Sequence, residues 1–457
     1  MFKLAWRNLL RNRRRTGATL LAMIVGMVGI LLFGGYAVTI ERGLQTAFVR
    51  SMGHMQIQHK DYLLYGSGNP SLYGIYDYEK IRSRIQSHAE LQNDISVITP
   101  VLTAGGIAGR YATGASKAVM VQGVEVEGQS KLRSWNAYGM KMRVLPNYLD
   151  GMAQNSAVLG GGVARVLGIC AQDESSSCAL PTLDTPQGEA LAQDIASLSH
   201  MERPAEAGED QIELLTATAA GVPNIARLQV VGIEKQGARE LDDIYVGVHL
   251  PQAQNLLNGG DGQVATAVLV QLYDTARLPY VKAKIQAILR EEMPGQPLIA
   301  HDFMTLQPLY ERIITMFEMI FGFIALLIAC VAIFTIGNTM NMAVMERTVE
   351  IGTLRSMGLR RGGVQSLFLC EGAMLGAIGC VLGIGMAWIA AGIINRAELA
   401  WLPPGVVYPS PIHIQLWAEP KFIMVCVGVL ILVSLLSTWF PAQRAARISI
   451  VDSLRYV

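Results

Sequence analysis

Four long apolar runs, almost free of charged side chains, divide the chain. They lie at residues 16–40, 317–345, 372–395 and 422–442. Each is longer than the ~20 residues that an α-helix needs to cross the hydrocarbon core of a bilayer. The first run is also too long for a secretory signal, whose apolar core has only about 7–15 residues. The pattern therefore predicts four transmembrane helices.

The region between the first two runs, residues 41–312, has a different pattern. Short segments rich in Val and Ile alternate with amphipathic segments, which is typical of a water-exposed α/β domain. The expected strands are 55–58, 96–99, 119–126, 228–233, 244–248 and 264–272. The expected helices are 78–89, 158–167, 251–257 and 275–291. Their mixed order predicts a βαβ-type layer, and a polar stretch at about 170–210 predicts an insertion.

Local charge predicts the orientation in the membrane. Residues 1–15 carry six basic side chains and no acidic one, with apolar residues at helical spacing, which predicts an interfacial helix that contacts lipid. Residues 346–371 and the tail 443–457 are also arginine-rich, whereas residues 396–421 carry equal numbers of acids and bases. Short basic segments lie on the cytoplasmic side. We therefore expect a multi-pass membrane protein with both termini in the cytoplasm.

These patterns together predict the fold class. It is an α-helical membrane protein with four transmembrane helices and a large extracytoplasmic, periplasmic α/β domain inserted between the first and the second. The composition agrees, because 51% of the residues are hydrophobic, 16% are charged and the mean hydropathy is +0.33. A few spans plus a large water-exposed domain account for these values. The net charge of +1 gives no reason to expect nucleic-acid binding.

Chemical motifs are scarce. The nearest approach to a phosphate-binding loop, Gly109–Gly114, lacks the lysine that reaches the phosphates of ATP. We therefore expect that the chain is not an enzyme and that it binds no cofactor. No His/Cys cluster has the spacing of a metal site, so no metal is expected either.

The stretch that joins the second and third apolar runs carries a family resemblance. ERTVEIGTLRSMG, preceded by NTMNMAVM, resembles the cytoplasmic loop of MacB/FtsX-type ABC permeases, the family that includes the lipoprotein-releasing permeases. The resemblance implies a coupling helix that docks on a separate or fused ATPase. The matching positions are Glu346, Arg347, Glu350, Ile351, Gly352, Leu354, Arg355 and Gly358. The tail also resembles the family's C-terminal helix, which adds Arg444, Leu454 and Arg455 as candidate ATPase contacts.

The residues of this loop also make predictions by themselves. The loop is expected to contain a short helix in which Arg347 and Glu350 form an i,i+3 ion pair. Ile351, Leu354 and Gly358 would share one face of that helix, and an apolar stripe on a water-exposed loop needs a partner to cover it. A solvated loop or a helix at headgroup level is the alternative.

The resemblance also implies a location in the bacterial inner membrane, and it implies partners. ATP and Mg²⁺ would be bound by the partner ATPase, and a second permease, identical or paralogous, would complete the complex. Residues 225–257, with the phrase GARELDDIYV, are most similar to the lipoprotein-releasing branch. That branch implies export of a hydrophobic or lipidated substrate, with a periplasmic adaptor or lipoprotein carrier as a further partner. The alternative is an FtsX-like signalling permease that controls a cell-envelope hydrolase without transport. A membrane-anchored enzyme or receptor would leave the loop unexplained.

Three further groups of residues are candidates for specific roles. One group consists of five tyrosines, which could form a surface for substrate or a partner: Tyr62, Tyr65, Tyr73, Tyr76 and Tyr78. Alternatively, these tyrosines could lie in the core or at the level of the lipid headgroups. Four glycines could allow close packing of the third span on another helix, within one subunit or between subunits: Gly372, Gly376, Gly379 and Gly383. A disulfide in an oxidising compartment could join Cys170 and Cys178.

The polar residues inside the apolar runs bear on mechanism. Apart from Glu318 at the edge of the second run, these runs hold no ionisable residue of the kind that usually marks a substrate or proton path. Polar residues gather near the end of the second run, at Thr335, Asn338, Thr339 and Asn341, where they can form hydrogen bonds between helices. The sequence therefore favours transmission of movement to residues 41–312 over conduction through the membrane.

Overall fold

The computed structural model describes residues 2–11, 13–66, 68, 70, 72–142, 144, 146–169, 210–218, 221–259, 263–401 and 410–449. The chain divides into two units, each treated separately below. The helical unit comprises the described residues of 1–42, 309–401 and 410–457. The sheet unit comprises the described residues of 43–308.

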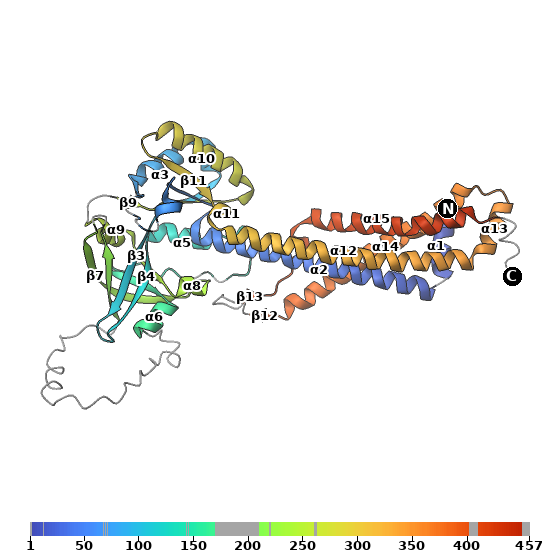
Figure 1. Ribbon diagram of the computed structural model, residues 1–457, viewed down its shortest axis with the longest axis horizontal. Helices are drawn as coiled ribbons and strands as arrows, with labels where there is room; N and C mark the ends of the chain where they lie inside the picture. The colour runs from blue at the N-terminus through green and yellow to red at the C-terminus, as the bar shows by residue number, and fades with distance from the viewer. Residues whose placement is uncertain are drawn as a thin grey trace, which may run out of the picture. The chain divides into compact units, whose positions relative to one another are not determined.

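Long helices build the helical unit (Figure 1). Its helices are α1 (Phe2–Arg11), α2 (Arg13–Met52), α12 (Pro308–Glu346), α13 (Thr348–Ser356), α14 (Arg361–Arg396) and α15 (Pro420–Arg447). In the described part of the chain, four of them, α2, α12, α14 and α15, are long and apolar enough to cross a membrane. They contain the four predicted spans and extend beyond them. Residues 361–371, expected to belong to a loop, form the first turns of α14 instead.

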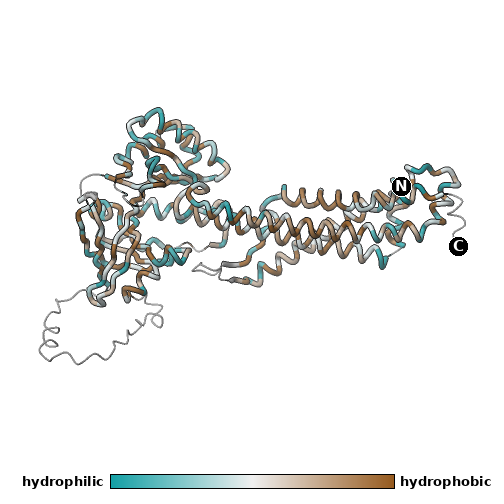
Figure 2. The backbone as a smooth tube through the Cα atoms, in the orientation of Figure 1, coloured by the Kyte–Doolittle hydropathy of each residue, from teal (hydrophilic) through white to brown (hydrophobic). Residues whose placement is uncertain are grey.

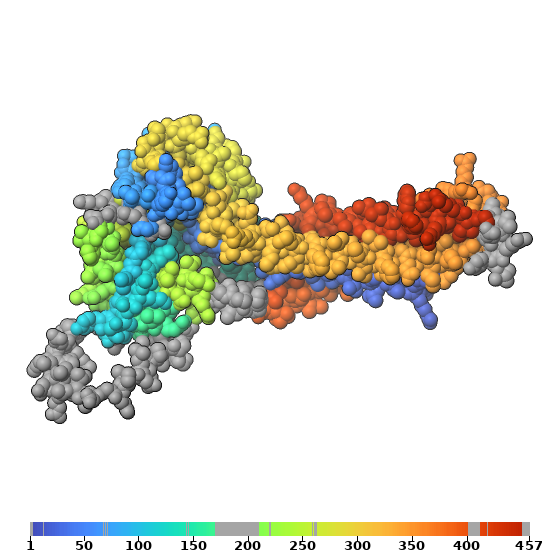
Figure 3. Space-filling view, viewed as in Figure 1, coloured from blue at the N-terminus to red at the C-terminus, as the bar shows by residue number. Residues whose placement is uncertain are grey.

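The core of the helical unit and its outer surface are both apolar (Figure 2). Met23 and Met27 of α2 are buried in one cluster with residues of α12, α14 and α15. On the outside, α12 and α15 make up much of the face that Figure 3 shows, and large apolar side chains such as Phe334 and Phe440 are more than half exposed. An apolar surface of this extent on long helices indicates that lipid surrounds them.

A mixed nine-stranded sheet forms the centre of the described sheet unit, in the order β11-β1-β10-β3-β4-β8-β5-β7-β6. Its strands are β1 (Met55–His59), β3 (Ile95–Arg110), β4 (Ala115–Val124), β5 (Ser156–Gly160), β6 (Gln211–Ala217), β7 (Pro223–Glu234), β8 (Tyr245–His249), β10 (Ala267–Leu272) and β11 (Leu298–Asp302). Only the β4–β8 and β5–β7 pairs are parallel. The sheet is therefore more antiparallel than the predicted βαβ layer.

Short elements complete the sheet unit. A separate two-stranded pair consists of β2 (Ile75–Tyr76) and β9 (Val264–Ala265). The helices are α3 (Tyr78–Ser87), α4 (Ala89–Gln92), α5 (Val126–Ser134), α6 (Gly161–Leu167), α8 (Arg239–Asp242), α9 (Leu250–Asn258), α10 (Leu278–Glu292) and α11 (Phe303–Leu306). In the helical unit, β12 (Ala400–Trp401) pairs with β13 (Ser410–Pro411).

The strands and helices expected in the sheet unit overlap observed elements of the same kind. The strands that were not anticipated are β2, β5, β6 and β11, and the helices that were not anticipated are α4, α5, α8 and α11. The helix expected at 158–167 is wrong in its first part, because residues 158–160 belong to β5. All five residues of β5 are buried. A strand covered on both faces has no polar alternation, so its apolar run looks the same as that of a buried helix.

Where α2 enters the sheet unit, the chain turns sharply and His54 connects several segments. Gly53 has a φ of 74° and packs on the Val270 backbone, a conformation that disfavours other residues. The Nδ1 atom of His54 accepts a hydrogen bond from the Leu272 amide at 3.0 Å, and Nε2 lies 3.0 Å from Thr275 Oγ1. The His54 carbonyl accepts from the amide of Phe303 in α11. His54 thus joins the segment that follows α2 to the segment that precedes α12.

Candidate functional site

The short helix predicted for the loop exists as α13, between the ends of α12 and α14. It ends at Ser356, and Gly358 follows with a φ of 99°, a left-handed conformation that favours glycine after a helix. The amide of Leu359 donates to the carbonyl of Leu354 at 3.1 Å, which satisfies one of the last carbonyls of the helix. Gly358 therefore terminates α13 and does not belong to its apolar face, contrary to the prediction.

The apolar side of α13 is covered by the chain itself. Ile351 is only 4% exposed and Gly352 is buried. Ile351 belongs to a cluster with Val344, Val364, Phe368, Ala442, Ala445 and Ala446. These residues come from α12, α14 and the end of α15. The stripe thus needs no partner for its cover, and α13 is held firmly by the ends of three long helices.

A buried charged network lies beside α13, and it replaces the predicted pair of Arg347 with Glu350. Arg347 donates to Glu371 at 2.9 Å, with side chains only 7% and 2% exposed. Asn8 of α1 donates to the same Glu371 oxygen at 2.6 Å, and Arg347 also donates to the Asn8 carbonyl at 3.2 Å. The i,i+3 prediction was wrong because Arg347 lies just before α13, where it points to α1 and α14 rather than along the helix.

Two exposed ion pairs connect α1 and α2 to the same region. Arg11 donates from one nitrogen, Nη2, to both carboxylate oxygens of Glu350, at 2.7 and 3.0 Å. Arg15 forms a bidentate pair with Glu346, in which two nitrogens donate at 2.7 and 2.5 Å. Each glutamate that the sequence singled out is therefore held by an arginine more than 300 positions away. We call this assembly of α1, α13 and the adjoining helix ends the α13 end of the helical unit.

Of the remaining side chains of α13, some contact the rest of the chain and others are exposed to solvent. Arg355 donates to the carbonyl of Ile448, and Leu354 is half-buried. The outward side presents Val349, which is 46% exposed, Thr353 and, just after the helix, Met357, which is 71% exposed. Arg444 of α15 lies over the ring of Phe440, 5.7 Å from its centroid. The other two tail candidates, Leu454 and Arg455, lie outside the described residues.

Comparison with known proteins finds relatives among ABC transporter permeases. Residues 322–450 match the FtsX-like permease C-terminal family model, which covers α13 and most of the helices around it. The chain is 24% identical to the lipoprotein-releasing system transmembrane protein LolE of Haemophilus influenzae, over 94% of this chain and 90% of that protein. It is 25% identical to LolC of Xylella fastidiosa, over 55% of this chain. It is also 26% identical to an uncharacterized ABC transporter permease of Methanocaldococcus jannaschii, over 50% of this chain.

Residues 322–450 thus carry an FtsX-like permease C-terminal domain, and the relatives of the chain include the ABC permease proteins LolC and LolE. The chain spans only about three fifths of the length of the LolC protein and 55% of the archaeal permease. The four apolar helices make this permease a multi-pass membrane protein.

The four glycines of the third span pack inside this one permease chain. Gly372 and Gly376 lie against Thr438 and Ser434 of α15, and Ser434 donates to the Gly372 carbonyl at 2.7 Å. Gly379 and Gly383 lie farther along the same face of α14, against Met23 and Met27 of α2. Of the two packing roles predicted, the intrachain one accounts for all four contacts.

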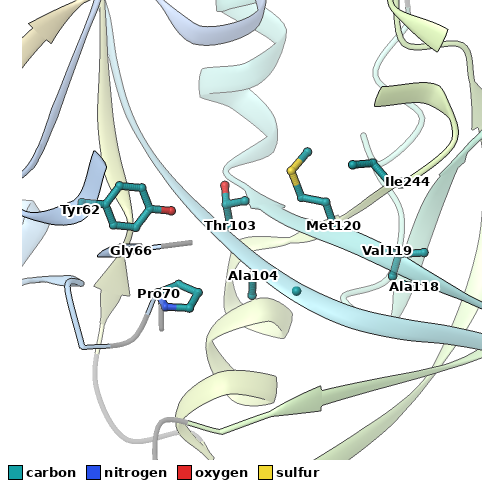
Figure 4. Close-up of a pocket in the computed structure, with 10 residues that line it drawn as sticks. Tyr62, Gly66, Pro70, Thr103, Ala104, Ala118, Val119, Met120 and Ile244 are labelled. Atoms are coloured by element: carbon teal, nitrogen blue, oxygen red, sulfur yellow. The ribbon is translucent and has the colours of Figure 1, made fainter. Parts of the chain in front are cut away.

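The five tyrosines separate into core and surface positions. Tyr62 lies in a π-helical turn, Tyr62–Gly66, and Tyr78 is buried at the start of α3; burial raises the pKa of both phenols. Tyr65 and Tyr76 are more than half exposed, and Tyr65 stacks on Tyr73. Tyr62 also lines an apolar hollow of about 370 Å³ with Thr103, Met120 and Ile244 (Figure 4). The tyrosines therefore do not form one surface.

Sequence reasoning missed Asn8, Arg11, Arg15 and Glu371 as members of the site. The spacing of Arg11 and Arg15 is i,i+4, which could have indicated a paired face, but no local signal connects them to Glu350 and Glu346. Cys170 and Cys178 lie outside the described residues. In the part of the chain that the structure describes, no group of three His, Cys, Asp or Glu side chains is placed to hold a metal ion.

Proposed function

We propose that this permease couples a partner ATPase to work on the opposite side of the membrane. The α13 end docks on an ATPase that binds ATP and Mg²⁺, and the complex contains two permease and two ATPase subunits. Movement of α13 is transmitted to the periplasmic sheet unit, which extracts or expels a hydrophobic or lipidated substrate. The family supports this role, and the names of the LolC and LolE relatives support a lipoprotein-release type of substrate.

The observation that carries the proposal is the division of α13 into a fixed side and a free side. Ile351 and Gly352 are buried against the chain, whereas Val349 and Met357 expose apolar surface. Exposed apolar side chains on a firmly held helix are typical of a contact point for another protein. A docked ATPase would press on α13 and, through it, on the helices that hold it.

The connections of α13 give a route for that movement. The cluster around Ile351 passes a displacement to α12, α14 and α15, and the Arg11–Glu350 pair passes it to α1. Inside the unit, Thr19 of α2 donates to Thr339 of α12 at 3.0 Å. These two helices are the ones that continue in sequence into the sheet unit, and α2 is unbroken from Arg13 to Met52. A stiff helix transmits movement along its length without a channel.

A substitution on the free side of α13 tests the docking. We expect Met357→Glu to abolish co-purification of the ATPase and the ATP hydrolysis of the complex, because it places a charge in an apolar contact, while thermal unfolding of the permease is unchanged. Met152→Glu is the matched control, since Met152 is half exposed but lies in the sheet unit. An unimpaired complex with Met357→Glu would refute docking through this side.

A second experiment distinguishes the two candidate functions, transport and signalling. Depletion of the permease should leave lipidated proteins in the inner membrane when it acts in release. An FtsX-like signalling permease, the alternative, would leave their distribution unchanged and instead lower the activity of a cell-envelope hydrolase. The FtsX-like family model leaves this alternative open to test.

A further inference from the structure

Helix α1 has two faces with different partners. Ala5 and Leu9 are buried in the core of the helical unit. Asn8, next to them, contacts Glu371, whereas Arg11, an exposed residue one turn after Arg7, contacts Glu350. The opposite side is formed by Lys3, Trp6, Arg7 and Leu10, whose i, i+3, i+4 and i+7 spacing aligns them on one face. All four are exposed, Trp6 and Leu10 each to 50%.

The basic side chains of this outer face lack acidic partners. Two of the arginines in residues 1–15 are neutralised, Arg11 by Glu350 and Arg15 by Glu346. Among the described residues, no acidic side chain forms an ion pair with Lys3, Arg7 or Arg14. Lys3 and Arg7 share this face with an exposed indole and a leucine, and Arg14 is exposed at the start of α2, so the face is both apolar and positively charged.

The position of α1 along the chain indicates what covers this face. It ends at Arg11, and α2, a helix able to cross a membrane, begins at Arg13. Because one residue separates them, α1 lies where the span leaves the hydrocarbon, at the depth of the lipid headgroups. Tryptophan is enriched at that depth, and basic side chains there interact with phosphate. An anionic lipid surface attracts such side chains.

We propose that the outer face of α1, made by Lys3, Trp6, Arg7 and Leu10 together with Arg14, binds the headgroups of anionic phospholipids. Trp6 and Leu10 enter the boundary between headgroups and acyl chains, and the three cations contact phosphate oxygens. The binding does not depend on the proposed ATPase, because α1 contacts α13 through Arg11 and not through these five residues.

The test measures which lipid lies beside Trp6. The full-length permease is placed in phosphatidylcholine nanodiscs with equal fractions of either brominated phosphatidylglycerol or brominated phosphatidylcholine, since bromine quenches a neighbouring indole. The contribution of Trp6 is the difference between the wild type and Trp6→Phe. We expect the anionic lipid to quench Trp6 about two- to fivefold more strongly, with the preference falling at high salt.

Variants and a second tryptophan provide the controls. Arg7→Gln with Arg14→Gln should abolish the preference, and Arg7→Lys with Arg14→Lys should retain it, because charge rather than shape attracts the lipid. Trp388 of α14 is 62% exposed on a span, and its contribution, measured with Trp388→Phe, should show no preference. Equal quenching of Trp6 by the two lipids would overturn the proposal. So would absence of quenching by either lipid, which would indicate that protein covers this face.

Discussion

Two kinds of ion pair at the α13 end differ in burial but hardly in geometry. Arg347 and Glu371 are 2.9 Å apart with side chains 7% and 2% exposed. Arg11 and Glu350 are 2.7 Å apart with side chains 52% and 51% exposed. An exposed pair typically contributes only ~0.2–1 kcal/mol, whereas removing one partner of a buried pair costs ~3–5 kcal/mol. Burial, rather than distance, therefore decides which pair the fold depends on.

The difference suits the two pairs to different tasks. The buried network fixes α1, the start of α13 and α14 in one arrangement, because separating its members would strand a charge away from water. The exposed pairs can break and re-form at little cost, since water solvates both partners. Under the proposed cycle, the exposed pairs would exchange while the buried network moves as a rigid piece.

The largest expected effect is on the buried pair. Glu371→Ala leaves Arg347 buried without its carboxylate and should lower the free energy of unfolding by about 3–5 kcal/mol. Thermal unfolding of the full-length permease in detergent measures this. A double variant with Arg347→Leu and Glu371→Met should recover much of the loss, because no charge is left buried. If Glu371→Ala is as stable as the wild type, the buried pair does not hold this end together.

The buried histidine His54, which stays neutral, provides a second test of how burial affects an ionisable group. His54 is fully buried, and burial lowers its pKa to about 4, below the ~6.5 of an unfolded histidine. The unfolded chain therefore binds the proton more readily between these values, so stability falls as the pH drops from ~6.5 to about 4. The total loss is about 3 kcal/mol. Unfolding midpoints across this range should fall less steeply in His54→Asn, which keeps an acceptor but does not titrate; equal slopes would contradict the assignment.

Two nearby glycines of α14 allow the same comparison of a buried and an open position, in this case without charged groups. An added Cβ on Gly383 would lie 2.6 Å from Met27 Cβ, whereas one on Gly385 would meet nothing within 4 Å. Gly383→Ala should therefore cost about 1–3 kcal/mol through overpacking. Gly385→Ala should be neutral or slightly stabilising. The two unfolding curves in detergent check this, and equal losses would refute the close approach of α14 to α2.

The smallest effect is expected for the exposed pair. A double-mutant cycle with Arg11→Ala and Glu350→Ala should give a coupling energy of ~0.2–1 kcal/mol that fades at high salt. Unfolding of the four proteins at two salt concentrations measures it. A coupling of several kcal/mol that resists salt would mean that the pair is shielded from water and that the contrast with Arg347–Glu371 is false.

The local sequence pattern was enough to predict some elements of this permease correctly but not others. The short helix at 348–356 was anticipated from its periodicity, and the strands with Val- and Ile-rich segments were found. Residues 158–160 were placed in a helix because a strand buried on both faces shows no alternation. The Arg347–Glu350 pair was a reasonable expectation from spacing, but Arg347 precedes the helix and points elsewhere.

The sequence by itself determined the four apolar helices and the family of the loop between the second and third. Both are properties of contiguous residues: a bilayer requires an uninterrupted apolar length, and the loop motif is a continuous string. Only the tertiary structure decided the partners of the charged residues. Glu371 meets Asn8 across 363 positions, and Glu350 meets Arg11 across 339. Such pairings depend on how separate helices pack side by side, and no periodicity within one helix records which neighbour it will have.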